Sequence, residues 1–330
     1  MFKGNYQIRP RQLRHFVTNN EVFIFAVKIL FLVALTLLVT AGLVLLLPRN
    51  PTSYFHGFRL KDERLKASSS PKIVLVGGSN VAFGMDSHVL SHEFGVNVVN
   101  TGLSAGLGLG FYLNSVEKYI HAGDSVVLSL EYEHYFQMTG GDLTLCELLF
   151  EEPHALRYLG WEHCRTLIEG FGRVCGWRLT KSGGFTPDRI YNAKAFNEYG
   201  DVVSHLDKRP ENTDPVSVSW GSAASVSSTV LERLAQFISH AEKRGARIYI
   251  LPPSYRDQDY TVNTQNIENI YQTLRTAFPK ETLSKPQDFV LNGNEYFFET
   301  KYHLNKRGRE IRTAKVVEFI FTARQKADGR

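Results

Sequence analysis

The segment from Lys72 to Gly84, KIVLVGGSNVAFG, decides the fold of this 330-residue chain. Ile73 to Val76 form a short, continuous apolar run, which is typical of a strand buried on both faces of a parallel sheet. The run ends in Gly77 and Gly78, a turn that leads from the strand toward a helix. In an open parallel sheet, ligands bind beyond the carboxyl ends of the strands, so Ser79 is a candidate functional residue.

The same alternation of strand and helix extends outward along the chain. The predicted strands are 73–76, 96–99, 125–130, 246–251 and 288–291. The predicted helices are 86–94, 107–121, 227–245, 267–278 and 306–324. Strands and helices that alternate at this spacing favour a parallel sheet with right-handed crossovers. The sequence therefore predicts one α/β domain over residues 72–330, with a doubly wound, flavodoxin-like parallel sheet in three layers.

Residues 139–225 interrupt this alternation. They are rich in glycine, aromatic and charged residues without a regular period, so we expect a long insertion that shapes a substrate face. Within it, Phe196 to Asp201 is a candidate for the rim of that face or for a surface turn. The three cysteines, Cys146, Cys164 and Cys175, permit one disulfide with three possible pairings, or stay buried free thiols. They lack C-x-x-C spacing and a histidine cluster, so no metal site is expected.

The N-terminal part of the chain has a different composition. Residues 1–28 carry five basic residues and one acidic residue, so a net charge of +4 out of the total +5 lies there. The rest of the chain is nearly neutral, which argues against a basic groove for nucleic acid. Residues 29–47 contain no charge and no proline, and a helix of about 20 such residues spans the roughly 30 Å core of a bilayer.

These features predict a cytoplasmic basic tail (1–21), a transmembrane anchor (22–47) and a stalk (48–71). The positive flank precedes the span, so we expect a single-pass protein of the cytoplasmic membrane whose C-terminal domain is periplasmic or extracellular. The bulky residues up to Pro48 argue against a cleaved signal peptide. A buried core helix is the alternative, although such a helix rarely lacks a polar face over this length.

Three clusters of polar residues fall where ligands bind in such a sheet, at 77–86, 100–106 and 299–305. A serine in a glycine-flanked turn from strand to helix suits a nucleophile beside backbone N–H groups that stabilise an oxyanion. A late histidine, His303, is the candidate base. Taken alone, the Gly-Gly-Ser sequence favours a tight turn whose serine caps a helix, and only the other two clusters shift the balance toward a nucleophile.

The order of these clusters resembles the SGNH (GDSL-like) hydrolase superfamily, whose nucleophile follows the first strand and whose histidine precedes the last helix. Gly78-Ser79-Asn80 resembles its first block and Asn100-x-Gly102 its second. His303-Leu304-Asn305 with Gly308 resembles the histidine block of membrane-anchored, cell-envelope members. The resemblance covers most of residues 72–324 and implies that Ser79 and His303 are catalytic.

Two positions depart from that superfamily. The family aspartate three residues before the histidine is Thr300 here, so Glu299, one residue earlier, is the candidate that orients His303. The family's third block, Gly-x-Asn-Asp, is replaced by residues 129–134. We therefore expect the oxyanion hole to consist of the backbone N–H groups of Asn80 and Gly102, with help from the Asn80 side chain. Loss of one such donor lowers the rate by about 10²–10³. A catalytically weak or inactive relative of the superfamily is therefore an alternative.

Two other motifs are weaker. Gly106-x-Gly108-x-Gly110 lacks the order of a nucleotide-binding loop, so close packing of a helix is the favoured explanation. Glu131, Glu133 and His134 are candidate metal ligands, but a solvated strand end is favoured.

The sequence thus predicts a serine-dependent acyl esterase or O-acyltransferase without a cofactor. Its expected partners are the lipid bilayer, an acylated extracytoplasmic glycan or another small acyl ester, and a membrane acyltransferase. The aromatic residues of the insertion suit stacking on sugars. The alternative is a catalytically weak or inactive accessory protein that keeps the fold and binds polysaccharide or a membrane acyltransferase.

Overall fold

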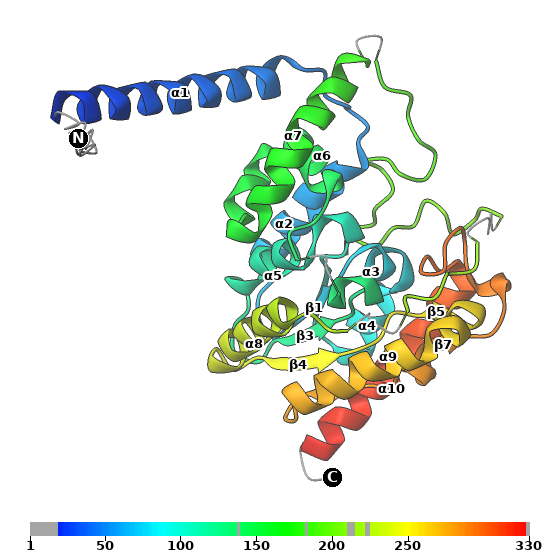
Figure 1. The fold of residues 1–330 in the computed structure, drawn as a ribbon. Helices are drawn as coiled ribbons and strands as arrows, with labels where there is room; N and C mark the ends of the chain where they lie inside the picture. Colours follow the sequence, from blue (N-terminus) through cyan, green and yellow to red (C-terminus); the bar gives the residue numbers. More distant parts are fainter. Residues whose placement is uncertain (1–18, 137–138, 182–183, 210–214, 222–224, 328–330) are drawn as a thin grey trace, which may run out of the picture. The chain divides into compact units, whose positions relative to one another are not determined.

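A computed structural model describes residues 19–136, 139–181, 184–209, 215–221 and 225–327. The chain divides into two compact units, residues 1–47 and 48–330 (Figure 1). Most of the predicted basic tail, residues 1–18, lies outside the described residues.

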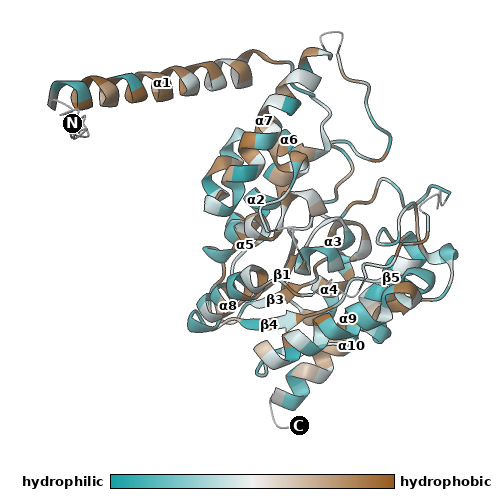
Figure 2. Ribbon diagram, in the orientation of Figure 1, coloured by the Kyte–Doolittle hydropathy of each residue, from teal (hydrophilic) through white to brown (hydrophobic). Residues whose placement is uncertain are grey.

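The first unit contains α1 (Asn19–Leu46), a helix of 28 residues with a mean hydropathy of 2.9 over Asn20–Thr40. Figure 2 shows it as a largely hydrophobic helix along most of its length. At 1.5 Å per residue it is about 42 Å long, more than the roughly 30 Å of a bilayer core. Nothing covers that window within the structure, unlike a core helix. Within the described part of the chain, α1 is the one helix long and apolar enough to cross a membrane.

The second unit is an α/β domain built on a five-stranded parallel sheet with the order β2-β1-β3-β4-β6. The strands are β1 (Lys72–Val76), β2 (Asn97–Asn100), β3 (Ser125–Leu128), β4 (Arg247–Ile250) and β6 (Thr282–Leu283). Ile73 pairs with Val98 on one side and with Ser125 on the other, so β1 is an interior strand as its apolar run predicts.

Alternate strand residues enter two hydrophobic clusters, and Figure 1 shows the sheet between helices. Val74 and Val76 belong to the cluster that includes residues of α5, α8 and α9, whereas Ile73 and Leu75 belong to the cluster with α4 and α10. These helices are α4 (Ser87–Phe94), α5 (Leu109–Glu117), α8 (Ser228–Lys243), α9 (Asp257–Ala277) and α10 (Lys306–Ala327). The period-2 alternation of a strand therefore supplies apolar side chains to both faces.

The predicted last strand lies elsewhere. Val290–Leu291 form β7, which pairs with β5 (Tyr255–Arg256) in a separate two-stranded sheet. The fifth strand of the main sheet is β6, only two residues long and half-buried. Two residues give no detectable periodicity, which is why the sequence did not predict it.

The predicted insertion contains regular structure. It forms a helical hairpin of α6 (Leu143–Glu151) and α7 (Cys164–Leu179), joined through short 3₁₀ helices. The 3₁₀ helices of the chain are η1 (Tyr54–His56), η2 (Ala105–Leu107), η3 (Tyr132–Tyr135), η4 (Pro153–Tyr158), η5 (Trp161–His163), η6 (Pro286–Phe289) and η7 (Asn294–Tyr296). The prediction of an irregular insertion is wrong for residues 143–179, because glycines within α7 mask its helical period.

The prediction of a stalk at 48–71 is also wrong. Residues 54–67 form η1 and α2 (Gly57–Ala67), and Tyr54, Phe58 and Leu65 are buried in the main core. The Phe58 ring lies 5.4 Å from the ring of Phe111 in α5, between ring centroids. The sequence did not predict this helix, because α2 is mostly polar and only one of its faces is apolar.

Replacing the Phe58 side chain tests whether α2 belongs to the domain. We expect Phe58→Ala to lower the free energy of unfolding by about 3–5 kcal/mol, as for other large-to-small core changes. The matched control is Glu63→Ala on the exposed face of the same helix, which should change it by less than about 0.5 kcal/mol. Equal small effects in urea denaturation would show that α2 is not part of the cooperative unit.

Candidate functional site

Ser79 is the first residue of α3 (Ser79–Gly84), directly beyond the end of β1. Positions 77 and 78 require glycine because the turn after β1 lies very close to residues 129–131. A Cβ on Gly77 would collide with the carbonyl of Ser129. A Cβ on Gly78 would lie 2.5 Å from the carboxylate of Glu131. The two glycines therefore bring the β1 turn against the loop after β3 and leave Ser79 half-buried.

His303 and Glu299 lie together on the loop before α10. Glu299 Oε1 is 2.9 Å from His303 Nδ1, the contact expected of a carboxylate that orients an imidazole. Burial alone would raise the pKa of Glu299, but hydrogen bonds from His303 and Tyr191 hold it below its ordinary value. The carboxylate is therefore charged at neutral pH and fixes the Nδ1 tautomer of the ring.

Tyr191 is a site residue that sequence reasoning missed. Its hydroxyl hydrogen-bonds Glu299 Oε1 and lies 3.2 Å from His303 Nδ1. Burial and the adjacent Glu299 raise the pKa of Tyr191, so the phenol stays protonated and donates. Tyr191 comes from the insertion, 108 residues before Glu299, and no local pattern could join the two.

The rest of the His303 environment is also ordered. The Phe83 ring, fully buried in α3, stacks on the imidazole with centroids 4.2 Å apart and planes 6° from parallel. Thr300, at the position of the family aspartate, accepts hydrogen bonds from the backbone N–H groups of Tyr302 and His303. Thr300 therefore stabilises the turn, and Glu299 is the residue that contacts Nδ1 of His303.

Ser79 and His303 line the same pocket, which has a volume of about 550 Å³. Aromatic and charged side chains from the insertion and from the segment after α1 complete its wall, among them Tyr54, Trp177 and Arg178. Among the described residues, no hydrogen bond joins Ser79 to His303. Catalytic hydrogen bonds are often long before substrate binds, so this arrangement is compatible with a resting enzyme.

The two predicted oxyanion donors already have acceptors. The backbone N–H of Asn80 donates to Glu131 Oε1 at 3.0 Å, and that of Gly102 donates to the Asn100 side chain at 3.0 Å. A Cβ on Gly102 would lie 2.7 Å from the carbonyl of Gly78, so this glycine serves close packing of the β2 loop. The structure therefore does not present either N–H to a ligand, which corrects that expectation for this state.

The side chain of Asn80 is also fully engaged. Its amide donates to the carbonyl of Ser129, and its Oδ1 accepts from Arg312 at 2.8 Å. Arg312, wholly buried in α10, also donates to the backbone carbonyl of Asn80 and to Ser129 Oγ. Burial lowers the pKa of Arg312 to about 10, which leaves the guanidinium charged at neutral pH.

Glu131 is not at a solvated strand end, and that prediction is wrong. Its side chain is buried, and Oε2 is an oxygen without a hydrogen-bond partner in the described structure. His134, also buried, lies 3.5 Å from this oxygen and hydrogen-bonds the carbonyl of Ala105 through Nε2. The Glu131 carboxylate thus accepts the backbone N–H of Asn80, one of the two predicted oxyanion donors.

Two other weak motifs have structural explanations. A Cβ on Gly106 would collide with Asp142 and Thr144 of the insertion, so this glycine serves packing, as expected. At the end of the segment Phe196 to Asp201, the buried Asp201 carboxylate binds Ser87, Asn100 and Arg309 within the domain. The three cysteines are free thiols. Among the described residues, no three His, Cys, Asp or Glu side chains are grouped as metal ligands.

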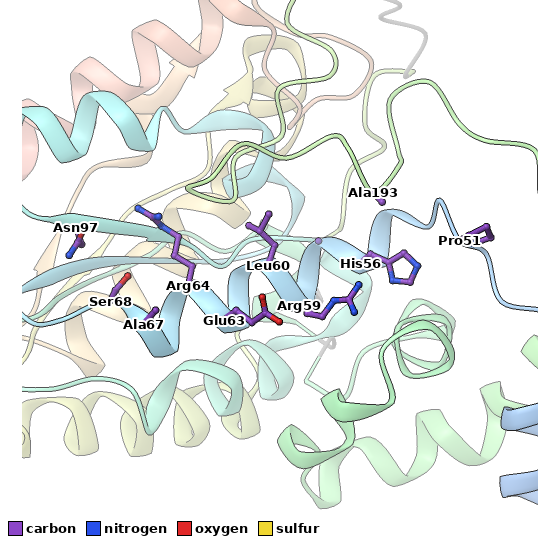
Figure 3. A pocket seen from close by; sticks show the side chains of 11 residues that line it. Pro51, His56, Arg59, Leu60, Glu63, Arg64, Ala67, Ser68, Asn97 and Ala193 are labelled. Atoms are coloured by element: carbon purple, nitrogen blue, oxygen red, sulfur yellow. The ribbon is translucent and has the colours of Figure 1, made fainter.

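A second pocket, of about 750 Å³, runs along α2 (Figure 3). Arg59, Glu63 and Arg64 project from the helix into it, and Asn97 and Ala193 lie at its border. His56 also lines this pocket. Its Nδ1 contacts Glu152, and its Nε2 contacts the carbonyl of Asn50. Its serine and its histidine, Ser68 and His56, lie at opposite ends of the pocket in Figure 3, so the Ser79 pocket is the candidate site.

Comparisons with known proteins do not add a family. No family model matches the sequence, and no curated protein matches it significantly. The function of the site is therefore argued from its geometry.

Removing the Tyr191 hydroxyl tests whether its hydrogen bond lowers the pKa of Glu299. Tyr191→Phe deletes one of the two donors that lower the pKa of Glu299, so that pKa should rise and the acidic limb of the pH–rate profile should move to higher pH. We expect ester turnover to fall about 10-fold, since a hydrogen bond to a charged group contributes about 1.5–3 kcal/mol. Tyr296→Phe is the control. An unmoved profile in Tyr191→Phe would contradict the role.

Replacing the Glu131 carboxylate tests whether it occupies the oxyanion hole. Glu131→Gln removes a negative charge that opposes an oxyanion and supplies an amide donor, so we expect ester turnover to rise about 10-fold or more. The control is Glu133→Gln. Glu133 lies two residues after Glu131 and accepts a hydrogen bond from the Tyr302 hydroxyl, so this change should have no such effect. Melting temperatures separate folding from function. A fall in turnover by a fully folded Glu131→Gln would show that the carboxylate assists the reaction.

Proposed function

We propose that the protein is a membrane-anchored serine acyl esterase or O-acyltransferase that acts on an extracytoplasmic glycan or another acyl ester. One observation carries this proposal: Glu299 lies 2.9 Å from His303 Nδ1, and His303 shares a 550 Å³ pocket with Ser79. A charged carboxylate, an imidazole and a half-buried serine at a helix start are the parts that acyl transfer requires.

The proposed reaction uses Nε2 of His303, the ring nitrogen that does not contact Glu299. Because Nδ1 bonds Glu299, Nε2 is the nitrogen that takes the proton of Ser79 Oγ as Oγ attacks the acyl carbon. His303 then returns that proton to the leaving alcohol oxygen as the ester bond breaks. Water or a sugar hydroxyl then attacks the acyl carbon and gives its proton to His303. The bond between the acyl carbon and Ser79 Oγ breaks, and Oγ takes the proton from His303. No cofactor enters these steps.

The placement of the site supports the SGNH-like assignment and the finer fold class. Ser79 follows β1, and His303 lies three residues before α10. The strand order β2-β1-β3-β4-β6, with helices against both faces, supports a doubly wound, flavodoxin-like sheet. The ligand site then lies beside the interior strand β1, where strand order reverses.

The proposed location is the cytoplasmic membrane, with α1 as a single-pass anchor and the α/β domain outside. The basic flank of residues 1–28 and the length of α1 support it. Trp177, Phe185 and Tyr191 in the pocket wall support a glycan ligand, because aromatic rings stack on sugars. A membrane acyltransferase is the proposed protein partner.

A second function is favoured by the oxyanion site. With the Asn80 and Gly102 N–H groups bonded to protein acceptors and the Glu131 carboxylate beside Ser79, catalysis lacks its usual electrostatic stabilisation. An accessory protein that binds an acylated glycan, or docks a membrane acyltransferase without turnover, accounts for that arrangement.

Substitutions at Ser79 and Glu299 decide between these functions. We expect Ser79→Ala to abolish turnover of an activated acetyl ester and labelling by an organophosphonate, with almost no change in melting temperature. Glu299→Gln should lower the rate by about 10²–10⁴ and add little once Ser79 is gone, since residues of one catalytic unit are not additive. Glu295→Gln, an exposed acid four residues earlier, is the control. Labelling that persists in Ser79→Ala would eliminate the mechanism, and no labelling of the native protein would favour the accessory function.

A further inference from the structure

The helix α6 contributes two acids to the wall of the Ser79 pocket. Glu147 and Glu151 are four residues apart, so they lie on the same side of α6, and both line the pocket. Like charges at this spacing repel each other. Asp188 adds a third carboxylate, whereas Arg178 is the one lysine or arginine among the described residues of the wall. The wall is therefore more acidic than basic.

Arg178 is committed to one of these acids. It donates to Glu151 Oε1 at 2.7 Å and to the carbonyl of Pro48 at 2.9 Å. Glu151 Oε1 also accepts the backbone N–H of Asn50 at 3.1 Å, while the buried Oε2 has no hydrogen-bond partner in the described structure. The side chains of Arg178 and Glu151 are almost inaccessible to water. This pair is therefore a fixed part of the wall, and its guanidinium forms no ion pair with the other acids there.

Glu147 is the acid of α6 that has no partner. Within the described part of the chain it is half-buried and forms neither a hydrogen bond nor an ion pair. Burial is the largest cause that raises the pKa of Glu147 above its ordinary value; Asp142 and Glu151 raise it further, and Arg178 opposes them. A carboxylate in such surroundings is costly unless a positive charge compensates it. A cation bound in the pocket would offset that cost.

Aromatic rings line the same pocket. Trp177 belongs to α7, and Phe185 and Tyr191 come from the segment that follows α7. The face of an aromatic ring attracts a cation, and such rings recognise quaternary ammonium ligands. The Arg178 guanidinium already lies 5.9 Å from the centroid of the Trp177 ring and 5.8 Å from that of Phe185. Carboxylates and aromatic faces together suit a ligand with a positively charged nitrogen.

We propose that the Ser79 pocket selects an acyl ester that carries a positively charged nitrogen, and that Glu147 is the specificity residue for this charge. The proposal rests on the Ser79 chemistry proposed above and adds the class of its substrate. Glu147 attracts the charged nitrogen, and the rings of Trp177 and Phe185 contact its carbon substituents. An anionic ester is disfavoured, because the Glu147 and Asp188 carboxylates line the same pocket.

Two esters of nearly the same shape test this selection. In 3,3-dimethylbutyl acetate a neutral carbon replaces the charged nitrogen of acetylcholine, and the rest of the molecule is the same. We expect the full-length protein to turn over acetylcholine with a kcat/KM about 10-fold higher than that of the neutral ester, because the pocket supplies both a carboxylate and aromatic faces to the charge. Equal kcat/KM values for the two esters would overturn the proposal.

Replacing the Glu147 carboxylate tests the residue. Glu147→Gln should raise KM for acetylcholine about 10-fold, with kcat and the turnover of the neutral ester unchanged. The matched control is Glu232→Gln, an exposed acid of α8, which should alter neither ester. Because Glu147 has no partner to lose, the melting temperature should not fall. Equal losses for both esters in Glu147→Gln would show a structural role and overturn the assignment.

Binding without turnover separates this proposal from the proposed function. Choline and its neutral counterpart 3,3-dimethylbutan-1-ol are titrated into full-length Ser79→Ala in a calorimeter. We expect choline to bind about 10-fold more tightly, and the added change Glu147→Gln to abolish the difference. If the native protein turns over neither ester but choline binds in this way, the esterase fails and the recognition of charge stands. If choline shows no such preference, the recognition of charge is overturned, whether or not the esters are turned over.

Discussion

The buried guanidinium of Arg312 joins three distant parts of the chain at the carboxyl edge of the sheet. It binds Asn80 after β1 and Ser129 after β3 from its own position in α10. Because a buried charge is costly unless it is hydrogen-bonded, the bonds from Nη1 and Nη2 constrain the geometry of both loops. The helix that Arg312 holds against the sheet begins three residues after His303, so the same interaction keeps His303 near Ser79.

The chemistry of the site depends on which groups meet Ser79. Glu299 and Tyr191 contact Nδ1 of His303, and Phe83 stacks on one face of the imidazole. The Glu131 carboxylate accepts the Asn80 N–H. In the proposed reaction this contact matters most, because donors aimed at developing charge are usually the largest contribution to catalysis. A site of this kind is either activated by movement of Glu131 or used for binding without turnover.

The segment that follows α1 belongs to the α/β domain and is not a stalk. Residues 54–67 pack into the core through Tyr54, Phe58 and Leu65, and Arg178 binds the carbonyl of Pro48. The insertion completes the pocket, since Trp177 and Arg178 of α7 and Tyr191, farther along the chain, line it.

The sequence alone determined the features that depend on neighbouring residues. The apolar run 73–76, the helical period of α10 and the uncharged stretch within α1 are local patterns, and Glu299 and His303 are four residues apart in one loop. Tertiary structure decided the features that depend on distant partners. Tyr191 reaches Glu299 across 108 residues, and Glu131 becomes a buried acceptor only because the Gly77-Gly78 turn packs against the β3 loop. Strand β6 and the packing of α2 were likewise unpredictable, because burial by a remote surface leaves almost no period in a short polar segment.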